Sequence, residues 1–242
     1  MLKNKLHIEK NVVIEENVKI GKGTRILEGS IIKRYTKIGD NCVIGPYAVI
    51  GGEPADFRFK GEVSYVVIGN NVTIREFATV HRATGEGEKT VIEDGVYIMP
   101  YAHISHNCLI KKNAVITNGA QLAGHVEIGE YAFIGGMAGI HQFTRIGKYA
   151  ILGACSYASQ DVCPYMLASG NPLRIYGVNM VGLKRHGFSQ EEIEEAKKIY
   201  RIFFKTDLKL DEKIMKIEDM NSKIAKDFLK FVKETKRGIR VK

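Results

Sequence analysis

The segment that decides the fold is residues 102–143, which read AHISHNCLIKKNAVITNGAQLAGHVEIGEYAFIGGMAGIHQF. Isoleucine or leucine occupies every sixth position of this segment, from Ile104 to Ile140, and a small or slim residue stands two positions before each of them. Histidines are set into this regular background at four positions: His103, His106, His125 and His141. The aliphatic ladder indicates a scaffold, and the histidines are the candidates for its chemistry.

A period of six matches neither the 3.6-residue period of a helix nor the two-residue alternation of a strand. It is typical of a repeat solenoid, in which each hexad forms one short strand and a corner. Three hexads close a triangular coil, so residues eighteen apart should stack at about 4.8 Å, with the aliphatic side chain inside. We interpret the glycines and asparagine beside the aliphatic residues as corner residues that need a positive φ. They are Gly21, Gly39, Gly45, Gly69, Asn70, Gly129 and Gly147.

The ladder extends outward from this segment on both sides. It keeps its phase from Ile14 to Ile50 and continues C-terminally as far as Ala158. Two lapses, near residues 52–63 and 83–89, have no inward aliphatic residue and are predicted to be loop insertions. Loops that interrupt a solenoid project from one face and often carry its binding function.

The periodicity changes in the C-terminal quarter of the chain. Ser189 and Glu192 form a predicted capping box, and apolar residues from Ile193 to Phe203 then follow helical spacing. Two weaker helical patterns follow, over residues 212–220 and 222–233. The predicted domains are therefore residues 1–165, a parallel β-helix, and residues 166–242, a linker with an α-helical C-terminal domain.

Composition limits the partners and the compartment. The 242-residue chain has a formal net charge of +9, which favours an acidic partner. Its four cysteines have no metal or disulfide spacing, and Cys42 and Cys108 fall at inward positions, as expected of core thiols in a reducing compartment. Met1 to Lys5 leads into no apolar segment, and no run is long enough to cross a membrane. We expect a cytoplasmic protein with no integral membrane segment and no nucleic-acid partner.

Three of the histidines crowd two successive coils. His103 and His106 straddle one corner, and His125 follows His106 by nineteen residues, one coil up and one column across. Corner positions face outward, so core packing does not explain these side chains. Their residue type leaves two interpretations, a metal site or general acid–base chemistry.

The hexad ladder resembles the hexapeptide-repeat acyltransferases, which wind as a left-handed parallel β-helix and assemble as homotrimers. Within them, the chain is similar to the UDP-N-acetylglucosamine O-acyltransferases that begin lipid A biosynthesis. The resemblance implies a mainly β fold, a left-handed parallel β-helix followed by a small α-helical C-terminal domain. The motifs that carry it are Thr73-Ile74-Arg75-Glu76, His81-Arg82, residues 102–106, 122–126, 134–137 and 141–143, Gly170-Asn171, Gly177-Val178-Asn179, residues 182–185 and Lys236-Arg237-Gly238.

The resemblance implies transfer of a (3-hydroxy)acyl chain from acyl carrier protein to the 3-position of UDP-N-acetylglucosamine or its 3-amino analogue. His106 matches the general base, and Gly124 matches the glycine whose N–H holds the oxyanion. Ala154 matches the residue that limits acyl-chain length. The positions that match substrate-binding residues are Asp56, Arg58, His103, His125, His141, Gln142, Asn179 and Arg185. The resemblance implies no cofactor and no metal, and it assigns the basic helical domain to the acidic acyl carrier protein.

Several positions depart from the family pattern. Asn107 follows the matched base where the family often has Asp, and an amide cannot stabilise an imidazolium with a charge. Arg58 stands for a usual Lys, which keeps the charge but changes its reach. Ala83, Val181 and His186 replace a common Gly, a frequent acidic residue and a second Arg.

Three alternative functions remain open from the sequence. A related N-acyltransferase acting on the 2-amino group of a UDP-amino sugar would be expected to have an additional N-terminal domain, which this sequence lacks. A zinc-dependent β-helix hydratase would need three histidines converging between subunits, which the spacing of His103 and His106 fits poorly. A non-catalytic scaffold or binding module would not need His106 beside Gly124.

Overall fold

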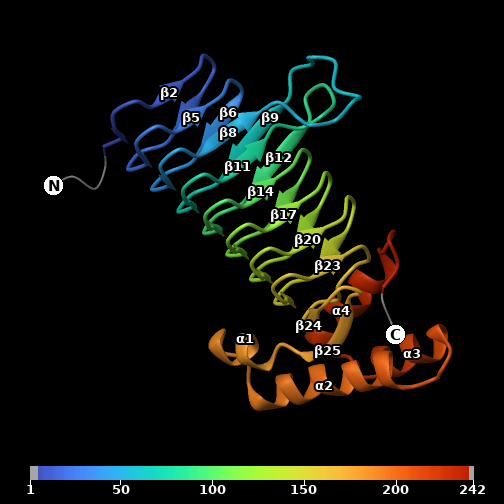
Figure 1. The fold of residues 1–242 in the computed structure, drawn as a ribbon. Helices are drawn as coiled ribbons and strands as arrows, with labels where there is room; N and C mark the ends of the chain where they lie inside the picture. Colours follow the sequence, from blue (N-terminus) through green and yellow to red (C-terminus); the bar gives the residue numbers. More distant parts are fainter. Residues whose placement is uncertain (1–4, 240–242) are drawn as a thin grey trace.

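The computed structural model describes residues 5–239 and shows a triangular prism of three sheets, whose strands are parallel except for the last strand of one sheet (Figure 1). Sheet I contains β1 (His7–Ile8), β4 (Arg25–Ile26), β7 (Val43–Ile44), β10 (Thr73–Ile74), β13 (Tyr97–Ile98), β16 (Val115–Ile116), β19 (Phe133–Ile134), β22 (Ile151–Leu152), β24 (Met166–Ser169) and β25 (Arg174–Val178). Sheet II contains β2 (Val13–Ile14), β5 (Ile31–Ile32), β8 (Val49–Gly52), β11 (Thr79–His81), β14 (His103–Ile104), β17 (Gln121–Leu122), β20 (Gly139–Ile140) and β23 (Tyr157–Ala158). Sheet III contains β3 (Lys19–Ile20), β6 (Thr36–Ile38), β9 (Tyr65–Ile68), β12 (Lys89–Ile92), β15 (Leu109–Ile110), β18 (Glu127–Ile128) and β21 (Arg145–Ile146).

The register of the sheets is the predicted one. His103 pairs with Gln121, and Gln121 pairs with Gly139, so residues eighteen apart stack. From Ile26 to Ala158 the ladder residues are buried and fill the prism, together with Cys42 and Cys108. The strands of each coil hydrogen bond to the strands of the coils above and below, and the apolar side chains share one continuous core. The prediction of a left-handed parallel β-helix is confirmed.

The three edges of the prism carry different residues and are named here by one member each. The His106 corner joins sheet II to sheet III and includes residues 105–108, 123–126 and 141–144. The Tyr149 corner joins sheet III to sheet I and includes residues 112–114, 130–132 and 148–150. The Met137 corner joins sheet I to sheet II and includes residues 100–102, 118–120, 136–138 and 154–156.

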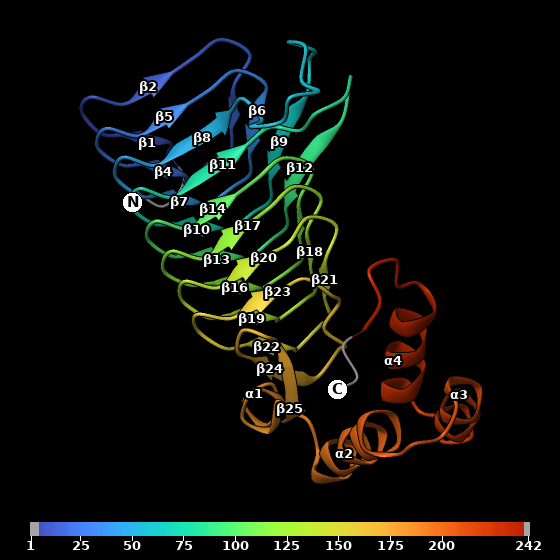
Figure 2. The same ribbon diagram turned by 45° about the vertical axis from the view of Figure 1, so that its right-hand side comes forward.

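Both loop insertions leave the prism at the His106 corner. The first lies between β8 and β9, and the second between β11 and β12 (Figure 2). Residues stacked across these insertions are further apart in sequence than eighteen: Val43 pairs with Thr73, and Thr79 pairs with His103. The six-residue ladder therefore keeps the same register on both sides of each insertion.

The sequence-based explanation of the corner glycines is wrong in one respect. None of the seven residues interpreted as corner residues has a positive φ; after Gly39 that conformation falls two residues later, at Asn41. Gly39 is needed for close approach, because a Cβ there would lie 2.5 Å from the carbonyl oxygen of Gly69 on the next coil. The left-handed positions also accept large residues, including Tyr101 and His125. The tertiary packing of the coils must therefore stabilise a conformation that such residues adopt rarely.

The C-terminal part of the chain packs as helices on the last coils. The helices are α1 (Met180–Arg185), α2 (Gln190–Lys205), α3 (Leu210–Glu218) and α4 (Lys223–Lys233). The predicted capping box is present at Ser189 and Glu192, whereas α1 and the β24–β25 hairpin have no counterpart in the sequence prediction. A second apolar core, centred on Phe203 and Phe228, holds the helices together. Ala168 belongs to the core of the prism, so the last coil extends past residue 165.

Figure 2 shows α4 beside sheet III, and two charged contacts join α4 and the residue that follows it to sheet III and the adjoining Tyr149 corner. Lys148 pairs with Asp227 at 2.5 Å, and Arg145 pairs with Glu234 at 3.4 Å. Within residues 5–239, none of the helices combines the length and the apolar character that a membrane crossing requires. Residues 1–4, which begin the segment interpreted above as lacking a leader, lie outside the described part of the chain.

Candidate active site

His106 lies at a corner of the prism, directly after β14, and its side chain is 7% exposed. The neighbouring Asn107 is held by the backbone of Thr84, which belongs to the second loop insertion. Asn107 Oδ1 accepts a hydrogen bond from the Thr84 N–H at 2.9 Å, and Asn107 Nδ2 donates one to the Thr84 carbonyl at 3.1 Å. These two bonds fix the orientation of the Asn107 amide.

The fixed amide decides the tautomer of His106. The Nδ1 atom of His106 lies 2.9 Å from Asn107 Oδ1, and an amide oxygen can only accept hydrogen bonds. Nδ1 must therefore carry the proton, which leaves a lone pair on Nε2. The departure from the family pattern at position 107 keeps the ring oriented but removes the charge beside Nδ1.

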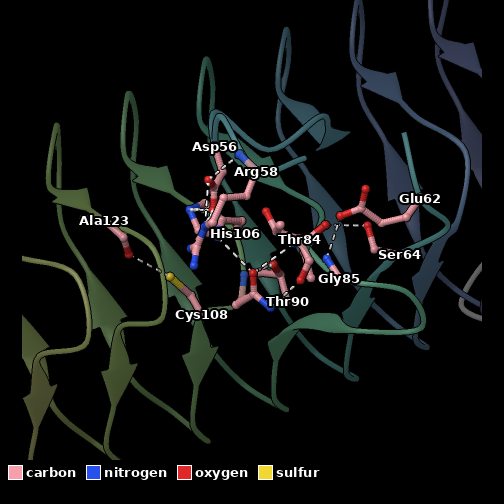
Figure 3. Close-up of polar contacts among 12 residues, drawn as sticks. Asp56, Arg58, Glu62, Ser64, Thr84, Gly85, Thr90, His106, Cys108 and Ala123 are labelled. Atoms are coloured by element: carbon pink, nitrogen blue, oxygen red, sulfur yellow. Dashed lines mark hydrogen bonds and ion pairs between the residues drawn. The ribbon is translucent and has the colours of Figure 1, made fainter. Parts of the chain in front are cut away.

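A carboxylate approaches the other ring nitrogen. Asp56 Oδ2, from the first loop insertion, is 3.8 Å from His106 Nε2 (Figure 3). Arg58 donates to both oxygens of Asp56, with Nη2 at 2.8 Å from Oδ2. These hydrogen bonds hold the pKa of Asp56 well below its usual range, so the group is an anion at neutral pH. A proton taken up at Nε2 would therefore be stabilised by Asp56.

Gly124 stacks on His106 one coil further along. A Cβ at Gly124 would overlap the Cε1 and Nε2 atoms of the His106 ring, so a side chain at this position would block the lone pair of Nε2. The Gly124 N–H donates no hydrogen bond within residues 5–239. The same holds at the equivalent corner residues Gly136 and Ala154, so the free amide is a property of the corner geometry. Of these three glycine and alanine positions, Gly124 is the one that lies against the His106 ring.

Two of the remaining candidate histidines flank His106 and are held neutral. His125 meets the His106 ring edge-on at 5.3 Å and stacks on Phe143 at 4.6 Å. Burial, reinforced by the nearby His106, lowers the pKa of His125. Burial, then His81 and His106, lower the pKa of His103 to about 4. Neutral imidazoles can donate and accept hydrogen bonds to a polar substrate without repelling the charge that forms on His106.

His81 and Thr79, both on β11, also belong to this cluster, and the sequence analysis did not assign them to it. The His81 ring meets His103 at 4.7 Å, and Thr79 Oγ1 lies 2.8 Å from His103 Nδ1. The signal was present, because the ladder resumes in phase after the second loop and so stacks Thr79 beneath His103. Burial, then His106, lower the pKa of His81.

The other candidate residues are divided among the three corners. Gln142 stacks on Gly124 at the His106 corner, and His141 precedes it. Ala154 is exposed at the Met137 corner. Asn179 caps α1 at the Tyr149 corner, where its Oδ1 accepts from the Gly182 N–H and its Nδ2 donates to the Tyr149 carbonyl. Arg185 is exposed in the last turn of α1. One chain therefore does not bring all the candidates together.

The described residues include no group of three or more histidine, cysteine, aspartate or glutamate side chains arranged to hold a metal ion. The chemistry available from the residues at the His106 corner is general base catalysis at His106 Nε2 with a free amide donor at Gly124.

Comparisons with known proteins identify the family of the chain. A sequence model of the bacterial transferase hexapeptide repeat matches residues 17–52 and 89–124. A model described as domain 2 of UDP N-acetylglucosamine O-acyltransferase matches residues 161–240. A protein of Burkholderia orbicola named acyl-[acyl-carrier-protein]–UDP-N-acetylglucosamine O-acyltransferase is 42% identical over 184 residues, which cover 76% of this chain and 70% of that protein. The chain belongs to this O-acyltransferase family.

Solved structures of the family match nearly the whole chain. The UDP-N-acetylglucosamine acyltransferase of Campylobacter jejuni has a TM-score of 0.82 and 36% identity, over 97% of this chain and 99% of that one. The Bacteroides fragilis enzyme has a TM-score of 0.88 and 31% identity, over 99% and 100% of the two chains. As a UDP-N-acetylglucosamine O-acyltransferase family member, the chain is an acyltransferase, which favours base catalysis over the hydratase and scaffold alternatives.

Proposed function

We propose that this chain transfers a (3-hydroxy)acyl group from acyl carrier protein to the 3-position of UDP-N-acetylglucosamine, the first step of lipid A biosynthesis, in the cytoplasm. Family membership supports the reaction class and both substrates. The observation that carries the mechanism is the lone pair on His106 Nε2, which Asn107 and Thr84 fix beside the free amide of Gly124.

The reaction follows from these groups. His106 Nε2 removes the proton of the acceptor hydroxyl while that oxygen attacks the thioester carbonyl carbon. The carbonyl oxygen becomes an oxyanion, which the Gly124 N–H stabilises, and Asp56 stabilises the imidazolium. The carbon–sulfur bond then breaks, and His106 returns the proton to the departing thiolate. The products are the acylated sugar nucleotide and the free thiol of acyl carrier protein.

We propose that the complete site forms between subunits of a homotrimer. Asp56, His106, Gly124 and Gln142 lie at one corner, whereas Asn179 and Arg185 lie at another. A heterologous contact repeated around a three-fold axis would place the His106 corner of each subunit against a different corner of its neighbour. Exposed apolar side chains on the Met137 corner support burial there. They are Tyr47, Phe77, Tyr101 and Met137, which are 45–69% exposed.

A subunit-mixing experiment tests the shared site. His106→Ala should lower turnover by about 10²-fold or more, and Arg185→Ala should weaken use of the sugar nucleotide. Co-expression of the two variants gives mixed trimers in which about a quarter of the interfaces carry both native residues, because each partner is drawn at random. We therefore expect about a quarter of wild-type activity. Mass spectrometry of the acylated sugar nucleotide measures it.

The matched control pairs two variants of one corner. His106→Ala co-expressed with Gly124→Ala should stay inactive, since no interface then contains an intact His106 corner. Activity in the control mixture, or none in the first mixture, would contradict the shared groove. Nearly normal turnover by His106→Ala alone would contradict the choice of base. Offering UDP-N-acetylglucosamine and its 3-amino analogue in competition decides whether oxygen or nitrogen is acylated.

A further inference from the structure

The chain beyond α4 turns back towards the last coils of the prism, as Figure 2 shows. Three contacts with Asp161, which has no exposed surface, hold this C-terminal tail. Thr235 Oγ1 donates to Asp161 Oδ2 at 2.6 Å, the Asp161 N–H donates to the Gly238 carbonyl at 2.9 Å, and Asp161 forms a parallel bridge with Ile239. The tail therefore has a defined position on the prism.

This position brings Arg237 to the His106 corner. The Nε and Nη2 atoms of Arg237 donate to the Ser159 carbonyl at 3.3 and 3.1 Å. Nη2 also lies 3.2 Å from Nδ1 of His141, which is one coil beneath Ser159. A guanidinium has no lone pair and only donates, so this contact requires Nδ1 of His141 to be the acceptor.

A second neighbour favours the opposite tautomer. The Gln142 carbonyl oxygen lies 3.1 Å from the same Nδ1 atom, and a carbonyl can only accept. The proton of a neutral His141 can satisfy one neighbour or the other. With a proton on Nδ1, the N–H would point at a permanent cation. The fixed charge of Arg237 therefore selects the form with the proton on Nε2, and Nε2 has no hydrogen-bond partner within residues 5–239.

We propose that Arg237 is a positioning residue of the acceptor-binding part of the site, which holds His141 as the Nε2–H tautomer so that it presents a donor to the sugar nucleotide. The role of His141 as a donor to the sugar nucleotide rests on the proposed function, whereas the tautomer inferred for His141 does not. The C-terminal tail, far from the repeats in sequence, would thereby determine whether a site histidine donates or accepts.

The first test is spectroscopic and uses the full-length protein with ¹⁵N-labelled histidine. The ring nitrogens of His141 are assigned by comparison with a His141→Gln sample. We expect the protonated nitrogen to be Nε2 in the wild type and Nδ1, bonded to the Gln142 carbonyl, in Arg237→Met. A wild type protonated at Nδ1, or a variant with an unchanged tautomer, overturns the proposal whether or not the chain transfers acyl groups.

The second test is kinetic. Arg237→Met should raise the KM for UDP-N-acetylglucosamine about tenfold, the usual scale for one hydrogen bond to a buried substrate, with a much smaller change in kcat. Arg237→Lys, which can still donate, should recover part of the loss. Lys236→Met removes the adjacent exposed charge and should leave both constants unchanged. Equal effects of Arg237→Met and Lys236→Met on the KM overturn the proposal. It is also overturned if a lower thermal midpoint of Arg237→Met accounts for the whole loss of activity.

Discussion

At the scale of single residues, Asn107 illustrates how one substitution changes two properties of a catalytic ring. Its Oδ1 keeps His106 in the tautomer that a carboxylate would also select, because both groups accept from Nδ1. Its Nδ2 makes a bond that a carboxylate cannot make, the donation to the Thr84 carbonyl. The amide therefore exchanges electrostatic support of His106 for a firmer connection to the second loop insertion.

Asn107→Asp separates these two effects. A carboxylate beside Nδ1 would favour the imidazolium, so the acidic limb of the pH–turnover profile should move to higher pH by about one unit, with modestly faster turnover on the plateau. The carboxylate would also face the Thr84 carbonyl, and the loss of this partly buried donor should lower stability by about 1 kcal/mol. A pH–rate series and a thermal melt measure the two outcomes. An unshifted acidic limb would contradict the proposed contact.

Ala154 is the second residue with a specific expectation. Its exposed methyl group on the Met137 corner would form the end of the acyl pocket in the proposed trimer. A methylene in an apolar pocket is worth about 0.8 kcal/mol, so a chain two carbons too long should be disfavoured about tenfold or more. Ala154→Gly should move the preference to longer acyl donors and Ala154→Met to shorter ones. A competition assay with mixed acyl carrier proteins reads the ranking, and an unmoved ranking in both variants rejects this role.

At the scale of elements, β11 and β14 carry a group of histidines whose neutrality comes from burial. The folded protein keeps His103 neutral down to about pH 4, whereas an unfolded chain protonates it near pH 6.5. Between these values the unfolded state binds more protons, so stability is complete above about pH 6.5 and is lost as the pH falls through this window. His81 and His125 have lowered pKa values and add to the same trend.

The expected result is an acid-sensitive fold. The thermal midpoint should decrease progressively from pH 7 to pH 4, and His103→Gln should flatten that decrease. His7→Gln, at an exposed position near the start of the prism, is the control and should leave the slope unchanged. Differential scanning calorimetry at several pH values measures the slopes. A His103→Gln slope equal to that of the wild type would show that this histidine does not contribute.

At the scale of the whole molecule, exposed cations lie on the helices that follow the prism. Lys198, Arg201 and Lys205 are exposed on α2. Lys213 is an exception, because its buried Nζ donates to the Phe203 carbonyl and so supports the fold. Exposed cations on one helix would attract an acidic protein over distances of about 8–10 Å, and salt would screen that attraction.

Salt should therefore affect the two substrates unequally. The KM for acyl-acyl carrier protein should rise between 50 and 300 mM NaCl, whereas the KM for UDP-N-acetylglucosamine should rise less. Lys198→Glu with Arg201→Glu should raise the first constant at low salt and reduce its salt dependence. Steady-state kinetics with each substrate varied in turn make the comparison. Equal salt dependence for both would remove the reason for assigning α2 to carrier-protein docking.

The sequence by itself determined the prism, because the inward side chain, the small residue before it and the corner recur every six residues. Each repeat contacts only the neighbouring coils, so the inward positions of Ile14, Ile50 and Ile140 could be predicted from the sequence without coordinates. The capping box at Ser189 was equally local. The two partners of the box, Ser189 and Glu192, are three residues apart, so no contact with a distant segment is needed to form it.

The tertiary structure decided everything that depends on residues brought together from distant segments. Thr84 and Asn107 meet because the second loop insertion leaves the prism at the His106 corner, and Arg237 reaches His141 because Asp161 holds the C-terminal tail. Asn179 and Arg185 lie beyond the regular ladder, so their position at the Tyr149 corner, away from His106, could not be predicted from the six-residue spacing. The left-handed conformation at the corners also has a tertiary origin. It is imposed by the stacking of whole coils, so Tyr101 and His125 adopt it although their own backbone preference opposes it.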